Sequence, residues 1–196
     1  MKVIGITGGI GSGKTTVVEL IAANYNAYII NTDDIAKKLM EPGEDGYKNV
    51  VEIFGEEILD EDKKIDRQKL AGIVFSNRNK LMVLNSIIHP MVKKFVMEKT
   101  GYLKCSEEFD YVIIESALLI QDHYEVICDE MWFVYAPDEV RAARLKRDRG
   151  YSDEKIADIF KNQPGAEEYR LHCKEVINND DGKDNILAQL KGLLRK

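Results

Sequence analysis

The sequence predicts an α/β fold built on a parallel sheet with helices on both faces, and three observations lead to this prediction. A glycine-rich segment near the N-terminus lies between an apolar run and a helical run. Further apolar runs alternate with helical segments along the 196 residues, as in parallel sheets joined by helical crossovers. Several runs are continuously apolar rather than alternating, which is typical of strands covered on both faces.

Five apolar runs are expected to form the strands of this sheet. They cover residues 2–7, 27–30, 111–115, 130–135 and 175–178. The interval 43–110 breaks the alternation, because it is too long for one crossover and contains no convincing strand. We therefore expect a core of residues 1–42 and 111–196 that carries a helical insertion at 43–110.

The insertion is expected to be helical because its apolar residues recur at helical spacing, for example between Leu81 and Phe95. Asp66 is expected to cap a helix N-terminus. Pro90 disfavours helix at His89 and suits the first turn of a new helix, so we expect a break or kink there. The insertion would serve as an acceptor-binding lobe, or as scaffold that does not touch substrate.

The glycine-rich segment matches the phosphate-binding pattern G-x-x-x-x-G-K-[ST] at every fixed position. Its glycines let backbone N–H groups converge on one anion, and the helix that follows adds its partial positive charge. Lys14 would reach the β- and γ-phosphates of a nucleoside triphosphate, and the Thr15 hydroxyl would ligate Mg²⁺. The residues expected around the phosphates are Gly8, Gly9, Ile10, Gly11, Ser12, Gly13, Lys14 and Thr15.

Two carboxylates follow the run 27–30, at the end of the sheet where parallel α/β folds bind ligands. Asp33 or Asp34 would accept the proton of an attacking hydroxyl or hold a water on Mg²⁺. The same segment also fits a helix start capped by Asn31 or Thr32, with acidic residues favouring the helix dipole. Both interpretations can hold together.

A third carboxylate, Glu115, ends the run 111–115. An acidic residue at this place in a nucleotide-binding fold would hold Mg²⁺ through water. The alternative is an ordinary charge at a strand end, and the residues alone leave both open.

A basic segment follows the fourth expected strand. A solvated helix face is one interpretation of such a run. The other is a lid over about 141–170, which brings arginines onto the charge that develops during phosphoryl transfer. The arginines concerned are Arg141, Arg144, Arg147 and Arg149.

The composition limits which functions and which cellular locations the sequence fits. With 28 basic and 34 acidic residues the net charge is −6, which argues against sequence-independent nucleic-acid binding. The three cysteines lack C-x-x-C spacing, so free thiols are expected rather than a zinc site. The first residues lead directly into the expected strand 2–7, and no apolar run is long enough to cross a bilayer. We therefore expect a cytoplasmic protein without a leader or a membrane segment.

Further motifs recur in order along nearly the whole chain, and together they resemble the dephospho-coenzyme A kinase family. The Leu-Asn-x-x-x-His-Pro run is much more specific than the phosphate loop. The matching pieces are Gly5 to Thr16, Thr32-Asp33-Asp34-Ile35-Ala36, Glu41-Pro42-Gly43, Ile65-Asp66-Arg67-Gln68-Lys69-Leu70, Val74-Phe75, Leu84-Asn85-Ser86-Ile87-Ile88-His89-Pro90, Leu118-Leu119, Arg144-Leu145 through Arg149, Gln163 and Val176-Ile177-Asn178-Asn179.

The resemblance implies transfer of the γ-phosphoryl group of ATP, with Mg²⁺, to the ribose 3′-hydroxyl of dephospho-coenzyme A, the final step of coenzyme A biosynthesis. It implies a P-loop NTPase fold similar to nucleoside monophosphate kinases, with five parallel strands, an acceptor-binding insertion and a lid. Together, the residues and the resemblance give the expected site. It has Asp33 as base with Lys14, Arg144 and Arg147 as catalytic partners, Thr16 and Asn179 at the nucleotide, Thr15, Asp33 and Glu115 at the metal, and Asp33, His89 and Leu118 at the substrate.

The chain departs from the family pattern in three places. The usual Asp-Ala-Asp is Asn31-Thr32-Asp33, the usual Pro-Leu-Leu is Ala117-Leu118-Leu119, and the usual Ala-Asp-Asp is Cys173-Lys174-Glu175. The second aspartate, which the family is thought to use as base, is kept as Asp33. These departures bear on metal and acceptor contacts more than on the class of reaction.

Three other functions compete with this interpretation. One is a nucleoside or nucleotide kinase with a different acceptor, and another is a nucleotide-binding regulator without catalysis. The joint presence of Lys14, Asp33 and the arginines weighs against the regulator. The third is a GTP-hydrolysing switch, for which the sequence lacks a guanine-reading Asn-Lys-x-Asp run.

Overall fold

The structure is a computed structural model that describes residues 1–195. Its contacts divide the chain into two compact units. The first is formed by Met1–Ile30 and by the chain from Thr100 onward, and the second by Asn31–Lys99. The second unit thus begins and ends earlier in the sequence than the insertion expected at 43–110.

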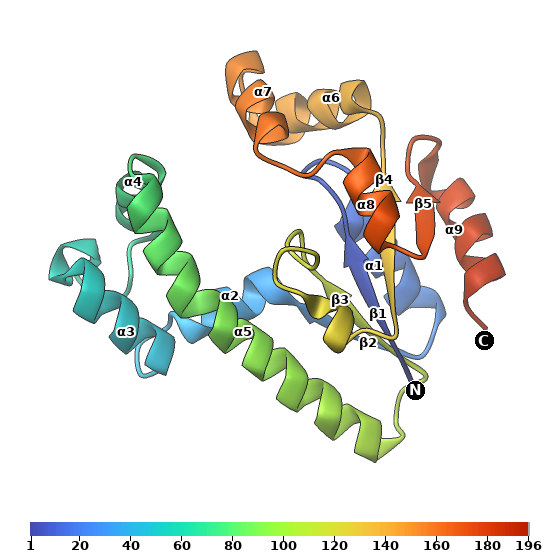
Figure 1. Cartoon of the computed structure of the whole chain (residues 1–196), viewed down its shortest axis with the longest axis horizontal. Coiled ribbons are helices and arrows are strands. Elements are labelled where there is room, and N and C mark those ends of the chain that lie inside the picture. Colours follow the sequence, from blue (N-terminus) through green and yellow to red (C-terminus); the bar gives the residue numbers. More distant parts are fainter. Residues whose placement is uncertain (196) are drawn as a thin grey trace. The chain divides into compact units, whose positions relative to one another are not determined.

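The first unit is built on a five-stranded sheet (Figure 1). Its strand order is β2-β3-β1-β4-β5, and β1 pairs in parallel with both β3 and β4, as β4 does with β5. The expected parallel sheet is therefore confirmed. The strands are β1 (Lys2–Thr7), β2 (Ala27–Asn31), β3 (Tyr111–Glu115), β4 (Glu130–Tyr135) and β5 (Glu175–Asn178).

Two helices cover one face of this sheet, α1 (Lys14–Asn24) and α9 (Gly182–Leu193). Their apolar residues join those of the strands in one buried cluster around Trp132, whose side chain is fully buried. Burial of this apolar surface is the main contribution to the stability of the unit. Other members of the cluster are Ile4, Ile6, Val17, Ile21, Ile113, Ile177, Ile186 and Leu190.

The opposite face is covered by α8 (Ala166–His172) and by the segment between β3 and β4. The ring of Tyr169 on α8 stacks on Phe133 of β4 with centroids 4.6 Å apart. Leu119 packs so closely over Gly5 that a Cβ there would lie 2.7 Å from its Cδ1. The remaining elements of this unit are α6 (Asp138–Arg149), α7 (Asp153–Lys161) and the 3-10 helix η2 (Tyr124–Val126).

The second unit is helical, as expected. Its elements are α2 (Thr32–Leu39), α3 (Asp45–Phe54), the 3-10 helix η1 (Glu56–Ile58), α4 (Arg67–Phe75) and most of α5 (Arg78–Ser106). The predicted cap is confirmed, because the carboxylate of Asp66 accepts hydrogen bonds from the N–H groups of Gln68 and Lys69. A capping side chain is a local signal, which is why the sequence alone predicts it.

Of the break or kink predicted at Pro90, the break is wrong, and a kink stays a prediction. Helix α5 runs from Arg78 to Ser106 with Pro90 inside it. A proline removes one backbone hydrogen bond and crowds the preceding turn. The buried side chains of Ile88, Val92 and Val96 lie on both sides of it, and their burial favours one continuous helix.

The three cysteines are free thiols, as expected, and they differ in exposure. Cys105 is exposed, whereas burial raises the pKa of the Cys128 and Cys173 thiols to about 12. Across residues 1–195, no helix is long and apolar enough to cross a membrane.

Candidate active site

The phosphate loop connects β1 to α1, and its backbone is shaped for an anion. Gly13 has a φ of 89°, in the left-handed region that glycine adopts without strain. Helix α1 then begins at Lys14 with no side-chain cap and no acidic residue in its first turn. A helix start without a side-chain cap is a site where an external acceptor such as a phosphate can bind the backbone N–H groups.

The side chain of Lys14 folds back over this loop. Its Nζ donates to the carbonyl oxygen of Gly8 at 2.9 Å and to that of Gly9 at 3.4 Å. These bonds place the ammonium beside the first residues of the loop. A cation there lies where the outer phosphates of a bound triphosphate would carry their charge.

A hydroxyl and a carboxylate meet at the other end of the loop. The Oγ1 of Thr15 donates to Oε1 of Glu115 at 2.9 Å, and the Glu115 side chain is buried at the end of β3. Mg²⁺ prefers oxygen ligands of these two kinds and keeps several of its waters. The pair therefore fits a magnesium ion bound through the hydroxyl and through a water on the carboxylate.

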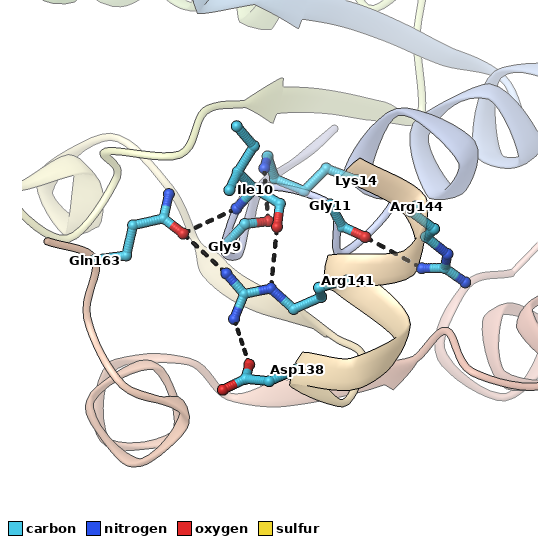
Figure 2. A network of polar contacts seen from close by, with 8 residues as sticks. All are labelled: Gly9, Ile10, Gly11, Lys14, Asp138, Arg141, Arg144 and Gln163. Atoms are coloured by element: carbon cyan, nitrogen blue, oxygen red, sulfur yellow. Dashed lines mark hydrogen bonds and ion pairs between the residues drawn. The ribbon is translucent and has the colours of Figure 1, made fainter. Parts of the chain in front are cut away.

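Helix α6 directs Arg144 at the same loop (Figure 2). Its guanidinium donates to the carbonyl oxygens of Gly11 and Ser12 at 3.3 and 3.2 Å, and to that of Asn179 at 2.8 Å. The Asn179 amide is buried and donates to the Ser12 carbonyl at 2.8 Å. Arg144 and Asn179 thus hold the loop from α6 and from the end of β5.

Two further residues contact the loop. The sequence analysis placed Arg141 among the lid arginines and Gln163 among the family motifs, but predicted no contact of either with the loop. Arg141 lies one helical turn before Arg144, and its Nε donates to the Ile10 carbonyl at 3.0 Å. Oε1 of Gln163 accepts from the Ile10 N–H at 3.1 Å and from Arg141 Nη2 at 2.9 Å (Figure 2). The usable signal was the three-residue spacing of the arginines, which puts both on one helix face.

Arg147 is differently placed. Its side chain is 73% exposed, and its Nε and Nη2 donate to the carboxylate of the adjacent Asp148 at 2.6 and 3.0 Å. These contacts do not bring it to the loop. Closure of the segment 141–170 over a nucleotide stays a prediction.

The aspartates of the predicted base position begin α2 in the second unit. Asn31 caps the helix by accepting from the Asp34 N–H at 3.1 Å. Lys37 donates to the Asp34 carboxylate at 2.6 Å. Asp33 is exposed, and among residues 1–195 its carboxylate has no hydrogen bond or ion pair. Capping and an available carboxylate therefore coexist in this turn.

The two residues expected at the acceptor lie in different units. His89 is partly buried within α5 of the second unit. Leu118 follows β3 in the first unit, is 38% exposed, and donates its N–H to Ser116 Oγ at 3.1 Å. Their contact with substrate stays a prediction.

The second unit contains a cavity of about 620 Å³ lined by the C-terminal end of α2, the segment 60–66, α4 and α5. Its floor is apolar and includes Ile65, Leu70, Val74 and Leu84. Charged side chains also line it, namely Lys37, Glu41, Asp60, Lys64, Asp66 and Arg67. A cavity of this kind fits a ligand with both an uncharged part and a charged group.

A family model described as dephospho-CoA kinase matches residues 2–185. The dephospho-CoA kinase of Carboxydothermus hydrogenoformans is 39% identical over 197 residues, covering 100% of this chain and 94% of that relative. Among solved structures, TT1252 from Thermus thermophilus has a TM-score of 0.80 at 30% identity, over 98% of this chain and 95% of the other. The dephospho-CoA kinase of Campylobacter jejuni has the same fold, with a TM-score of 0.68 at 23% identity over 99% of this chain and 100% of the other.

Proposed function

The chain belongs to the dephospho-CoA kinase family, and from this premise we propose how its residues carry out the transfer. The family moves the γ-phosphoryl group of ATP to dephospho-CoA, which is the final step of coenzyme A biosynthesis. The proposals below concern the metal, the base, the arginines and the place of the acceptor.

The donor proposal rests on one observation above others, the Thr15–Glu115 hydrogen bond beside the uncapped start of α1. The loop N–H groups and those of Lys14, Thr15 and Thr16 bind the phosphates of ATP, and Lys14 neutralises the outer two. The Thr15 hydroxyl and, through water, the carboxylates of Glu115 and Asp33 would hold Mg²⁺. This ion would offset negative charge on the phosphates during the transfer.

We assign the role of general base to Asp33. Its carboxylate is exposed in the first turn of α2, whereas that of Asp34 is paired with Lys37. A base must be within hydrogen-bond reach of the proton that it takes, here the one on the ribose 3′-hydroxyl. An engaged carboxylate would have to give up its ion pair first.

Arg144 and Arg147 act on the transferring phosphoryl group in this proposal. A guanidinium offers a rigid fork of donors that matches phosphate oxygens. Arg144 is already held beside the loop by Gly11, Ser12 and Asn179. Arg147 would be brought in by closure of the lid.

Dephospho-CoA is proposed to use the cavity of the second unit. Its pantetheine arm is long and uncharged, and its diphosphate is anionic. The apolar side chains around Leu70 and Val74 suit the arm. Lys64 suits the diphosphate, and so do Lys37 and Arg67 once they leave their ion pairs with Asp34 and Glu41. His89 and Leu118 are further proposed acceptor contacts.

The test is an ADP-release assay coupled to a chromogenic reaction. Dephospho-CoA is compared with adenosine, AMP, uridine and pantetheine phosphate. We expect turnover with dephospho-CoA to exceed that with the others by at least about 100-fold. Only this acceptor makes all the contacts whose binding energy can stabilise the transition state. Equal turnover with adenosine or uridine would support a nucleoside kinase instead. A cytoplasmic location and independence from nucleic acid stay predictions.

A further inference from the structure

Both polar backbone groups of Ile10 are bound by side chains from outside the loop (Figure 2). Arg141 Nε donates to the carbonyl oxygen at 3.0 Å, and Gln163 Oε1 accepts from the N–H at 3.1 Å. A hydrogen bond of 2.9 Å between Arg141 and Gln163 also joins these two side chains to each other. The tip of the phosphate loop is therefore tied to α6 and to the segment between α7 and α8.

The guanidinium of Arg141 is built into this position. Only 13% of its side chain is exposed, and it lies 4.2 Å from the ring centroid of Phe160. Its charge is met by Asp138 at 2.8 Å, whose own side chain is 69% exposed. A Cβ at Gly9 would overlap Nη2, so this glycine leaves the space that the guanidinium fills.

The contacts of Lys14 indicate that the Ile10 N–H would lie at the γ-phosphate end of a nucleotide bound in the loop. Phosphates bound by a P-loop extend outward from the start of the helix, and the loop lysine reaches the outermost of them. Here Lys14 Nζ bonds to the carbonyls of Gly8 and Gly9, the residues just before Ile10. An oxygen of a γ-phosphate and Oε1 of Gln163 are thus acceptors for the same donor.

We propose that Gln163 is a latch that the γ-phosphate of bound nucleotide displaces from the N–H of Ile10. The inference rests on the proposed binding of the ATP phosphates in this loop. A triphosphate takes over the N–H, and the Nη2 of Arg141, released from Gln163, bonds to the γ-phosphate in its place. A diphosphate leaves the latch closed. Gln163 is in this sense a positioning residue that couples the 162–165 segment to the presence of a transferable phosphoryl group.

The first experiment compares the Kd of the β,γ-imido analogue of ATP with that of ADP, both with Mg²⁺. Gln163→Leu keeps the volume but removes the competing acceptor. The ratio Kd(ADP)/Kd(analogue) is expected to rise about fivefold, the factor that corresponds to one net hydrogen bond. Asn162→Ala is the matched control, because within residues 1–195 the hydrogen bond of this neighbouring side-chain amide is to the Asp158 carbonyl of its own helix.

An unchanged ratio in Gln163→Leu would overturn the latch, and so would a selective weakening of the analogue. Equal changes for both nucleotides would show a structural role and also overturn it. If neither nucleotide binds to the wild-type chain, it is the proposed function that fails rather than the latch.

The second experiment needs no variant and measures amide hydrogen exchange of the wild-type chain. With the imido analogue, the amides of Asn162, Gln163 and Gly165 should exchange at least about threefold faster than with ADP, while loop residues 11–16 are protected by both. Equal exchange of 162–165 in the two complexes would contradict the latch.

Discussion

The hydroxyl of Thr15 and the carboxylate of Glu115 form a 2.9 Å hydrogen bond between residues that are 100 positions apart. The register of the sheet explains it. Strand β1 pairs with β3 so that Ile6 lies opposite Glu115, and the loop and α1 continue directly from β1. Adjacent parallel strands thus bring the hydroxyl and the carboxylate to one end of the sheet.

Replacing Lys14 with alanine should abolish transfer and leave the fold intact. The ammonium neutralises charge on the β- and γ-phosphates, and its loss costs several kcal/mol, of the order of 3, in the transition state. Steady-state kinetics give the loss, and circular dichroism with a thermal melt tests the fold. Turnover near that of the wild type would remove Lys14 from the site.

Replacing Asp33 with asparagine should lower kcat by about 10²–10⁴-fold with little change in KM for ATP. The amide keeps the size of the side chain but cannot accept the proton. Asp34→Asn is the matched control, and its effect should be much smaller because Asp34 is paired with Lys37. A larger loss of kcat in Asp34→Asn would show that Asp34 rather than Asp33 is the base. Equal losses would indicate that both carboxylates bind the metal.

Substitutions of Arg144 and of Arg147 should differ in their effects on activity and on melting temperature. Arg144→Lys should lower kcat/KM about 100-fold and also lower the melting temperature, because an ammonium cannot bridge the loop carbonyls and Asn179. Arg147→Ala should lower kcat alone, because its contacts are with the exposed Asp148. Full activity in alanine variants of Arg144, Arg147 and Arg149 would identify a solvated helix face.

The ionisation of Glu130 should make the free energy of unfolding depend on pH in the acidic range. Burial raises the pKa of its carboxyl, but hydrogen bonds from Lys174, Lys2 and Trp132 outweigh this and lower the pKa to about 2. A pKa that is lower in the folded state adds stability above the unfolded value of 4.5, and this stability is lost as pH falls toward 2.

The measurement is urea denaturation of the wild type and Glu130→Gln between pH 7 and pH 2. The variant should be less stable at pH 7 by roughly 2 kcal/mol, and the difference should shrink as pH falls. A difference at pH 2.5 as large as at pH 7 would contradict the assignment of the charge.

Much of the fold could be predicted because its signals are local. The run 27–30 forms β2 (Ala27–Asn31), and the glycines, Lys14 and Thr15 form the loop between β1 and α1, since each depends on neighbours in the sequence. The cap at Asp66 is local for the same reason. Pro90 is the counterexample, because side chains packed on both sides of it keep α5 continuous.

The sequence by itself determined the strand–loop–helix that binds phosphate, the class of fold and, through the family, the reaction. Only the tertiary structure decided which arginines of the basic segment contact the phosphate loop. A spacing of three residues predicts that two side chains share a helix face, but not what that face packs against. The tertiary structure selected Arg141 and Arg144, joined Gln163 to Ile10, and paired Thr15 with Glu115. These contacts join residues on different strands and helices, and their distances follow from the order of the sheet rather than from any local pattern.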